Sequence, residues 1–173
     1  MAFYKVTILV FVFLIFLMAR CVANDQEPKP KTTTIYLYEN SKRIVLDSTT
    51  PSFKAVLLAA EDLLKTADST SRQLITEKKL SEIKEGRAVE IIYANVQSAI
   101  IPFNSQTLYY TSIVIPLTDQ YVNGSVFFRG IYARTAMPNV PDYHIADMQL
   151  GTVTNSKGIS YLISALNRAS NTP

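Results

Sequence analysis

The sequence predicts an α+β domain that contains an antiparallel sheet of about four to five strands. Three observations indicate this class: β-branched and aromatic runs dominate residues 88–133, one long amphipathic helix precedes them, and a second apolar stripe lies near the C-terminus. The connections between the predicted strands are too short for crossover helices, so neighbouring strands should pair antiparallel. Helices that stand apart from such a run pack on the sheet in layers.

The chain begins with an apolar segment that has the layout of a secretory signal peptide. Lys5 precedes an uncharged run over 6–19, and small residues lead to a cleavage position after Ala23. The run is shorter than the roughly 20 residues of a membrane-spanning helix, and Arg20 closes it. We therefore predict a signal peptide over 1–23, no transmembrane segment in the mature form, and a secreted protein that works in an extracellular or periplasmic space.

Removal of the signal peptide would leave a nearly neutral domain. The remaining 150 residues are the usual size of one domain. Two of the 17 basic residues would leave with the signal, so 15 cations would face 14 acids, a net charge of +1. No basic stripe or arginine-rich arm is present, which argues against a nucleic-acid partner because such binding depends on neutralising phosphates.

The only cysteine of the chain is Cys21, which lies inside the signal. The mature domain would then have no disulfide, no thiolate nucleophile and no cysteine-bound zinc, and its stability must come from packing. An alternative is a lipid attached at Cys21, in which case residues 24–34 would tether the domain to a membrane surface.

Two segments open the mature chain. Residues 24–33 are polar, include two prolines and have no apolar periodicity, so they predict a flexible linker. The β-rich runs at 34–38 and 43–46 flank a polar turn and predict a first hairpin. We therefore expect a single α+β domain over 34–173.

Three helices follow from capping residues and apolar spacing. Ser48 to Pro51 signals a helix start, and apolar side chains recur at helical spacing from Phe53 to Ala67. Thr76 can cap a shorter second helix that stops at Gly86. A last helix begins at Asn155 or Ser156, and its apolar side carries Ile159, Leu162, Ile163 and Leu166.

The predicted strands lie between these helices. Residues 68–72 are expected to form a loop, and a short strand is expected at 73–75. The main strands are expected at 88–94, 96–101, 108–115 and 125–133, with a further strand over 144–153.

The strands of the C-terminal half concentrate aromatic side chains. Tyr109 and Tyr110 are adjacent, as are Phe127 and Phe128, so each pair must point to opposite faces of the sheet. One face forms the core, and the other is either covered by helices or left as an aromatic patch. For the exposed-patch alternative, the predicted binding residues are Tyr110, Phe128 and Arg129, because tyrosine and arginine are enriched at binding hot spots.

Two loops carry further candidates. The segment 134–143 contains two prolines that would stiffen it, and we expect Asn139 and Tyr143 to act in recognition there. Asn123 begins the one N-x-[ST] sequence, so it is the predicted glycosylation site. The Asn-Gly pair at the same place also favours a tight turn.

Signals for enzymatic chemistry are sparse. His144 is the only histidine, and Asp142 and Asp147 stand near it. Metal sites use three or four ligands, usually with more histidine or cysteine, and the chain has neither a G-x-S-x-G elbow nor a glycine-rich phosphate loop. We predict no cofactor and no metal.

The sequence thus predicts a non-enzymatic module that binds a protein or peptide and is monomeric or weakly associating. Two alternatives stay open at this point. One is an extracytoplasmic, hydrolase-like enzyme centred on His144, and the other is an envelope-associated structural protein.

Overall fold

A computed structural model describes residues 32–70, 75–118, 124–133 and 149–170. These ranges contain three helices, α2 (Pro51–Lys65), α3 (Glu77–Glu85) and α4 (Ser160–Ser170). They also contain seven strands: β1 (Thr34–Glu39), β2 (Lys42–Val45), β3 (Ser69–Thr70), β4 (Arg87–Ile101), β5 (Gln106–Pro116), β6 (Ser125–Ala133) and β7 (Gln149–Thr154). The predicted α+β class is confirmed.

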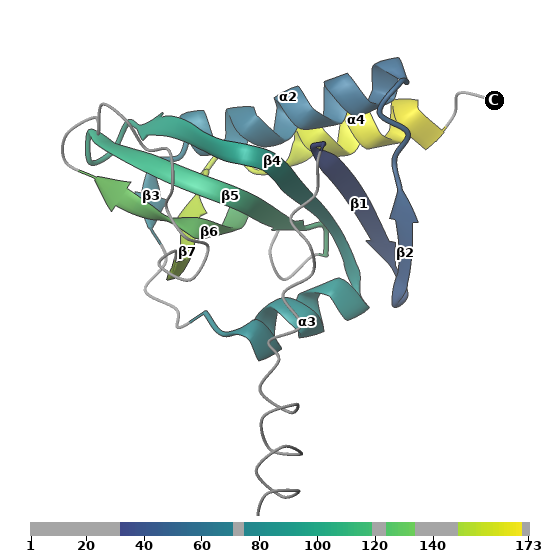
Figure 1. Ribbon diagram of the computed structural model, residues 1–173, viewed down its shortest axis with the longest axis horizontal. Coiled ribbons are helices and arrows are strands. Elements are labelled where there is room, and N and C mark those ends of the chain that lie inside the picture. Colours follow the sequence, from purple (N-terminus) through teal and green to yellow (C-terminus); the bar gives the residue numbers. More distant parts are fainter. Residues whose placement is uncertain (1–31, 71–74, 119–123, 134–148, 171–173) are drawn as a thin grey trace, which may run out of the picture.

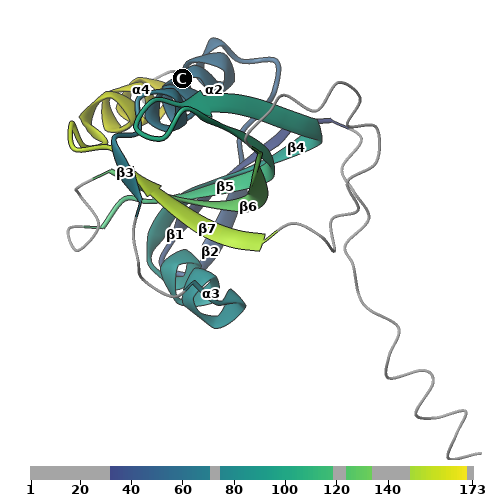
Figure 2. The same cartoon turned by 90° about the vertical axis from the view of Figure 1, so that its left-hand side faces the viewer.

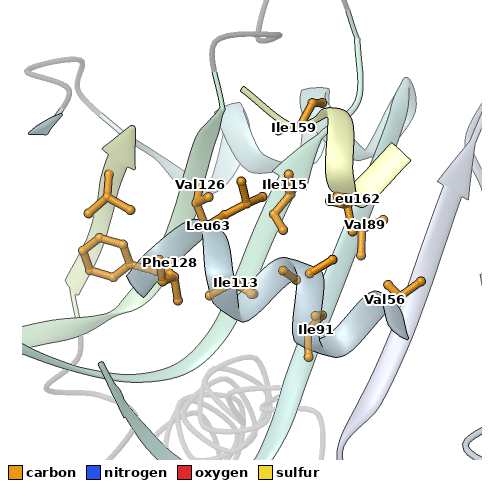
Figure 3. Close-up of a cluster of buried hydrophobic side chains, with 14 of the residues drawn as sticks. Val56, Leu63, Val89, Ile91, Ile113, Ile115, Val126, Phe128, Ile159 and Leu162 are labelled. Carbon is orange, nitrogen blue, oxygen red and sulfur yellow. The ribbon is translucent and has the colours of Figure 1, made fainter. Parts of the chain in front are cut away.

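The elements form three layers, with the sheet in the middle (Figures 1 and 2). Helices α2 and α4 lie side by side on one face, which we call the two-helix face, and α3 lies on the opposite face. Apolar side chains of α2, α4 and the sheet interdigitate under the two-helix face, as Figure 3 shows for Val56, Leu63, Ile113 and Leu162. A smaller apolar cluster lies under α3.

Local sequence signals account for the first two helices. The Thr50 hydroxyl accepts a hydrogen bond from the Phe53 N–H at 3.3 Å, and Pro51 occupies the first turn of α2, where its missing N–H costs nothing. The Thr76 hydroxyl likewise accepts from the Lys79 N–H at 3.2 Å and begins α3. The predicted apolar stripe of α2 is buried, and both helices end close to their predicted positions.

The sheet is larger than predicted, because seven strands join in the order β2-β1-β4-β5-β6-β7-β3. The prediction of about four to five strands treated the first hairpin as a separate unit. Instead, β1 pairs with β4 over six residues, from Thr34 opposite Ile92 to Glu39 opposite Arg87. The strand β3 also lies in the segment 68–72 that was expected to be a loop, and it pairs with the end of β7.

Two irregularities bend the central strands. The two strands predicted at 88–94 and 96–101 are one strand, β4, whose register against β5 shifts between Ile92 and Gln97. Against β6, the strand β5 has one extra residue at Thr111, a β-bulge. Bulges increase the local twist, and this one lets Tyr110 and Ile113 both face the core under the two-helix face.

Several predictions concern residues outside the described ranges. The signal peptide over 1–23 and nearly all of the predicted linker lie there, as do most of the short strand predicted at 73–75 and the first five residues of the strand predicted at 144–153. The described end of that last strand is β7. Within the described ranges, no helix combines the length and the apolar character needed to cross a membrane.

Candidate functional site: a groove beside β7

The predicted aromatic residues Tyr110 and Phe128 lie in the core rather than on the surface. Their exposed fractions are 2% and 3%, and both pack in the cluster beneath α2 and α4. Arg129 points to the opposite face, where its guanidinium forms an ion pair with Glu77 of α3. Of the two alternatives for the aromatic face, helix cover is therefore the one observed, and these three residues do not form one exposed patch.

The other sequence candidates lie outside the described residues. Asn139 and Tyr143 of the predicted recognition loop, the predicted glycosylation site Asn123, and His144 of the hydrolase alternative all belong to this group. Of the Asn-Gly turn, Gly124 is described, and its φ of +74° agrees with the predicted tight turn.

One side of β7 is only partly paired. The strand β3 reaches only Val153 and Thr154, so in the described part of the chain no strand lies beside residues 149–152 on that side. The Asn155 N–H donates to the Gly124 carbonyl at 3.2 Å, which fixes the alternation of hydrogen-bonded pairs between β6 and β7. Because hydrogen-bonded and non-hydrogen-bonded pairs alternate along β7, Leu150 and Thr152 direct their main-chain groups away from β6.

A groove of about 510 Å³ lies beside this unpaired stretch, and we call it the β7 groove. Its described lining consists of Thr70, Phe128, Gly130, Ile131, Gln149, Leu150, Gly151 and Thr152. The strand registers put Thr70, Gly130 and Gly151 on the same side of the sheet as Phe128, which packs under the two-helix face. The β7 groove thus lies at the sheet edge, and its other lining residues, Ile131, Leu150 and Thr152, belong to the α3 face.

Two glycines shape the floor of the β7 groove. A β-carbon at Gly151 would lie 2.4 Å from Cζ of Phe128, so the ring lies directly over this glycine. A β-carbon at Gly130 would lie 2.3 Å from the main-chain oxygen of Tyr109. Glycine at these two positions therefore permits close packing on neighbouring strands, and at Gly151 the Phe128 ring occupies the place of a side chain.

Two tyrosine rings lie on the same face of the sheet as this floor. Tyr110 is paired with Gly130 across the sheet, and its ring meets that of Tyr93 edge-on with centroids 5.3 Å apart. Burial, followed by the nearby charge of Glu61, raises the pKa of Tyr110 to about 12. Burial raises the pKa of Tyr93 as well. Both phenols are therefore neutral over the physiological pH range.

Thr152 also lines the β7 groove, but its side chain points to the α3 face, because Thr152 stands opposite Phe127. Thr152 is 6% exposed, and its Oγ1 makes no hydrogen bond within the described structure. An unsatisfied buried hydroxyl is costly, and buried polar groups without partners are uncommon. On the two-helix face the lining side chains are Thr70 and Gln149, which are polar, and Phe128, which is apolar. This composition suits an apolar group that arrives with polar main-chain atoms.

A polar cluster fixes the end of β3 next to the groove. The Asp68 carboxylate accepts hydrogen bonds from the N–H and the hydroxyl of Ser156, and the Asp68 N–H donates to the Thr154 carbonyl at 3.0 Å. The hydrogen bonds from Ser156 lower the pKa of Asp68. Asn155 donates from its amide to the Thr66 hydroxyl and so ties the same corner to α2.

The opposite face holds a buried carboxylate beneath α3. Glu90 is 7% exposed, accepts a hydrogen bond of 2.6 Å from the Tyr38 hydroxyl and pairs with Lys84 of α3. Burial, together with this hydrogen bond, raises the pKa of Tyr38. With the pair between Glu77 and Arg129, α3 has one ion pair to the sheet near each of its ends. These contacts fasten α3 to the sheet, so we assign them a structural role.

Within the described ranges, no three histidine, cysteine, aspartate or glutamate side chains gather in a way that could hold a metal ion.

The sequence analysis did not identify Gly130, Gly151 and Thr70 as groove residues. A signal for the glycines was present, because an isolated glycine within a strand pattern indicates a bulge or a close backbone approach. The groove itself depends on where β3 stops, which local sequence did not indicate.

Comparison with known proteins adds no identification. The chain matches no protein-family model, no curated protein and no solved structure.

Proposed function

We propose that this protein is a secreted, non-enzymatic binding module that takes up an extended peptide segment at the open side of β7. One observation carries the proposal: a stretch of β7 that no other described strand pairs on one side lies next to a groove of about 510 Å³. Strand addition at a sheet edge uses main-chain hydrogen bonds for affinity and adjacent pockets for side-chain specificity. The secreted location rests on the layout of residues 1–23.

The chemistry of the β7 groove defines the expected peptide. The outward main-chain groups of Leu150 and Thr152 supply donors and acceptors for an incoming strand. Phe128 offers apolar contact, on the two-helix face, to a side chain that enters the groove beside it. The preferred peptide is therefore extended, and it carries an apolar residue at the position that faces the groove.

Selection from a library of linear peptides displayed on phage, with the purified protein as the target, tests this proposal. The selected sequences should share an alternating pattern with one apolar position, and the free peptides should bind in a fluorescence-polarisation assay. His144 of the hydrolase alternative lies outside the described residues, and within those residues no observation favours catalysis.

A matched pair of substitutions on β3 locates the binding. Thr70 and Ser69 are both exposed and adjacent, but only Thr70 lines the β7 groove. Thr70→Trp should fill the groove and weaken the selected peptides at least tenfold, whereas Ser69→Trp should leave their affinity unchanged. If no peptide is enriched, or if both variants bind like the original protein, the proposed function is wrong.

A further inference from the structure

The opposite edge of the sheet ends in a strand whose side chains are all exposed. The four residues of β2 pair with β1 on one side only, and no other described strand lies beyond them. Ile44 is 47% exposed and Val45 is 59% exposed. An open edge that carries apolar side chains is a template for pairing with another chain.

The exposed apolar side chains of β2 lie on both faces of the sheet. Ile44 stands opposite Leu37, which packs against the two-helix core, whereas Val45 stands opposite Tyr36 on the α3 face. The Leu46 N–H donates to the Ile35 carbonyl at 3.0 Å, so these two residues form a hydrogen-bonded pair. Because such pairs alternate along an antiparallel ladder, Arg43 and Val45 make no main-chain hydrogen bonds with β1. Their main-chain groups therefore point away from the sheet.

This arrangement is self-complementary. The two outward residues, Arg43 and Val45, are placed symmetrically about Ile44. An antiparallel second copy of β2 would thus put each Ile44 against its counterpart and each Arg43 against a Val45, with the outward hydrogen-bonding groups in register. No two like charges would stand directly opposite each other.

The charges favour the same alignment. Asp47 lies two residues beyond Val45, so it would occupy the diagonal position from Arg43 of the other copy, within reach of a long side chain. The symmetry repeats this pair on the other side. Asp47 is exposed, and hydrogen bonds from Thr49 lower its pKa, so its carboxylate is ionised at neutral pH.

We propose that two copies of this protein associate through β2 and join their sheets into one continuous antiparallel sheet. The joined sheet would carry the two β7 grooves at its far ends, because β7 lies near the opposite edge of the strand order from β2. The paired strand is short, so the interface is smaller than a standard one and the association is weak and reversible. The proposal does not depend on peptide binding at the groove.

Sedimentation velocity of the purified protein over a concentration series from low micromolar to submillimolar tests the association. The protein should shift from monomer to dimer, and Ile44→Lys should abolish the dimer because two lysines would then face each other. Ile100→Lys is the matched control, because Ile100 is 69% exposed on β4, away from β2. This control should dimerise like the original protein.

Charge reversal tests the register. Arg43→Glu and Asp47→Lys should each weaken the dimer at least tenfold, and the double variant should regain most of the loss. Thermal unfolding of each variant establishes that it is folded. A protein that stays monomeric at every concentration, or a dimer that Ile44→Lys leaves intact, would overturn the proposal. A different protein that co-purifies in equal amounts and is released by Ile44→Lys would also overturn it, since that partner would then be the occupant of β2.

Discussion

The ring of Phe128 lies across Gly151 so closely that a β-carbon at position 151 would stand 2.4 Å from its Cζ. This contact connects the core under the two-helix face with the floor of the β7 groove. Apolar side chains contact Phe128 on the core side, and the backbone of Gly151 contacts its ring on the groove side. The shape of the groove therefore depends on the packing of the core.

Gly151→Ala should destabilise the protein by about 1–3 kcal/mol, because the Phe128 ring must move out of a packed position. Gly130→Ala should cost more, since its β-carbon would meet the main-chain oxygen of Tyr109, which moves less easily than a ring. Urea unfolding of both variants measures the two costs. Unfolding free energies for both within about 0.5 kcal/mol of the original protein would contradict this packing.

Thr152→Val should stabilise the free protein by about 1 kcal/mol, because it removes a buried hydroxyl that has no described partner and keeps the side-chain shape. Thr66→Val serves as the opposite case, since the Thr66 hydroxyl donates to the Asp62 carbonyl at 2.6 Å and accepts from Asn155. Denaturant titration should give changes of opposite sign. A loss of stability in Thr152→Val would mean that its hydroxyl has a partner.

Tyr38→Phe should destabilise the protein by about 1–3 kcal/mol, because the buried Glu90 carboxylate loses its 2.6 Å hydrogen bond. Tyr93→Phe is the matched control: Tyr93 is also buried, but its hydroxyl has no hydrogen bond in the described structure. Chemical unfolding should show little loss for this second variant. Equal losses of stability for the two variants would contradict a stabilising role of the hydrogen bond between Tyr38 and Glu90.

The hydrogen bonds from Ser156 to the Asp68 carboxylate, next to β3, should make stability depend on pH in the acid range. The folded pKa of Asp68 is lowered, so its ionised form stabilises the fold above the unfolded value of about 4. That contribution is lost as the pH falls through the folded pKa. Thermal midpoints of Asp68→Asn and Ser156→Ala should therefore fall less steeply with acid than those of the original protein. An unchanged acid slope in both variants would contradict the assignment.

Local signals were sufficient for several elements of the fold. The cap at Thr50, the proline at the first turn and the apolar stripe predicted α2, and Thr76 with Gly86 predicted α3. The run Ser125–Ala133 became β6 with the predicted bounds. In each case the residues that determine the element lie within it or at its ends, so neighbouring sequence contains the information.

Long-range pairing was not predictable in the same way. The strand β3 is two polar residues long, and it is a strand only because Ser69 and Thr70 meet the end of β7. The hairpin joins the sheet because β1 finds β4 about fifty residues along the chain. Alternation also left open which aromatic residues would be covered, because the pleat gives two faces without saying which of them the helices occupy.

Amide hydrogen exchange, followed by NMR, tests the central claim of strand addition at β7 most directly. We predict that a selected peptide slows the exchange of the Leu150 and Thr152 amides and leaves the amides of Arg43 and Val45 on β2 unchanged. Slower exchange on β2 alone, or a bound peptide that leaves both β7 amides as they were, would contradict the account.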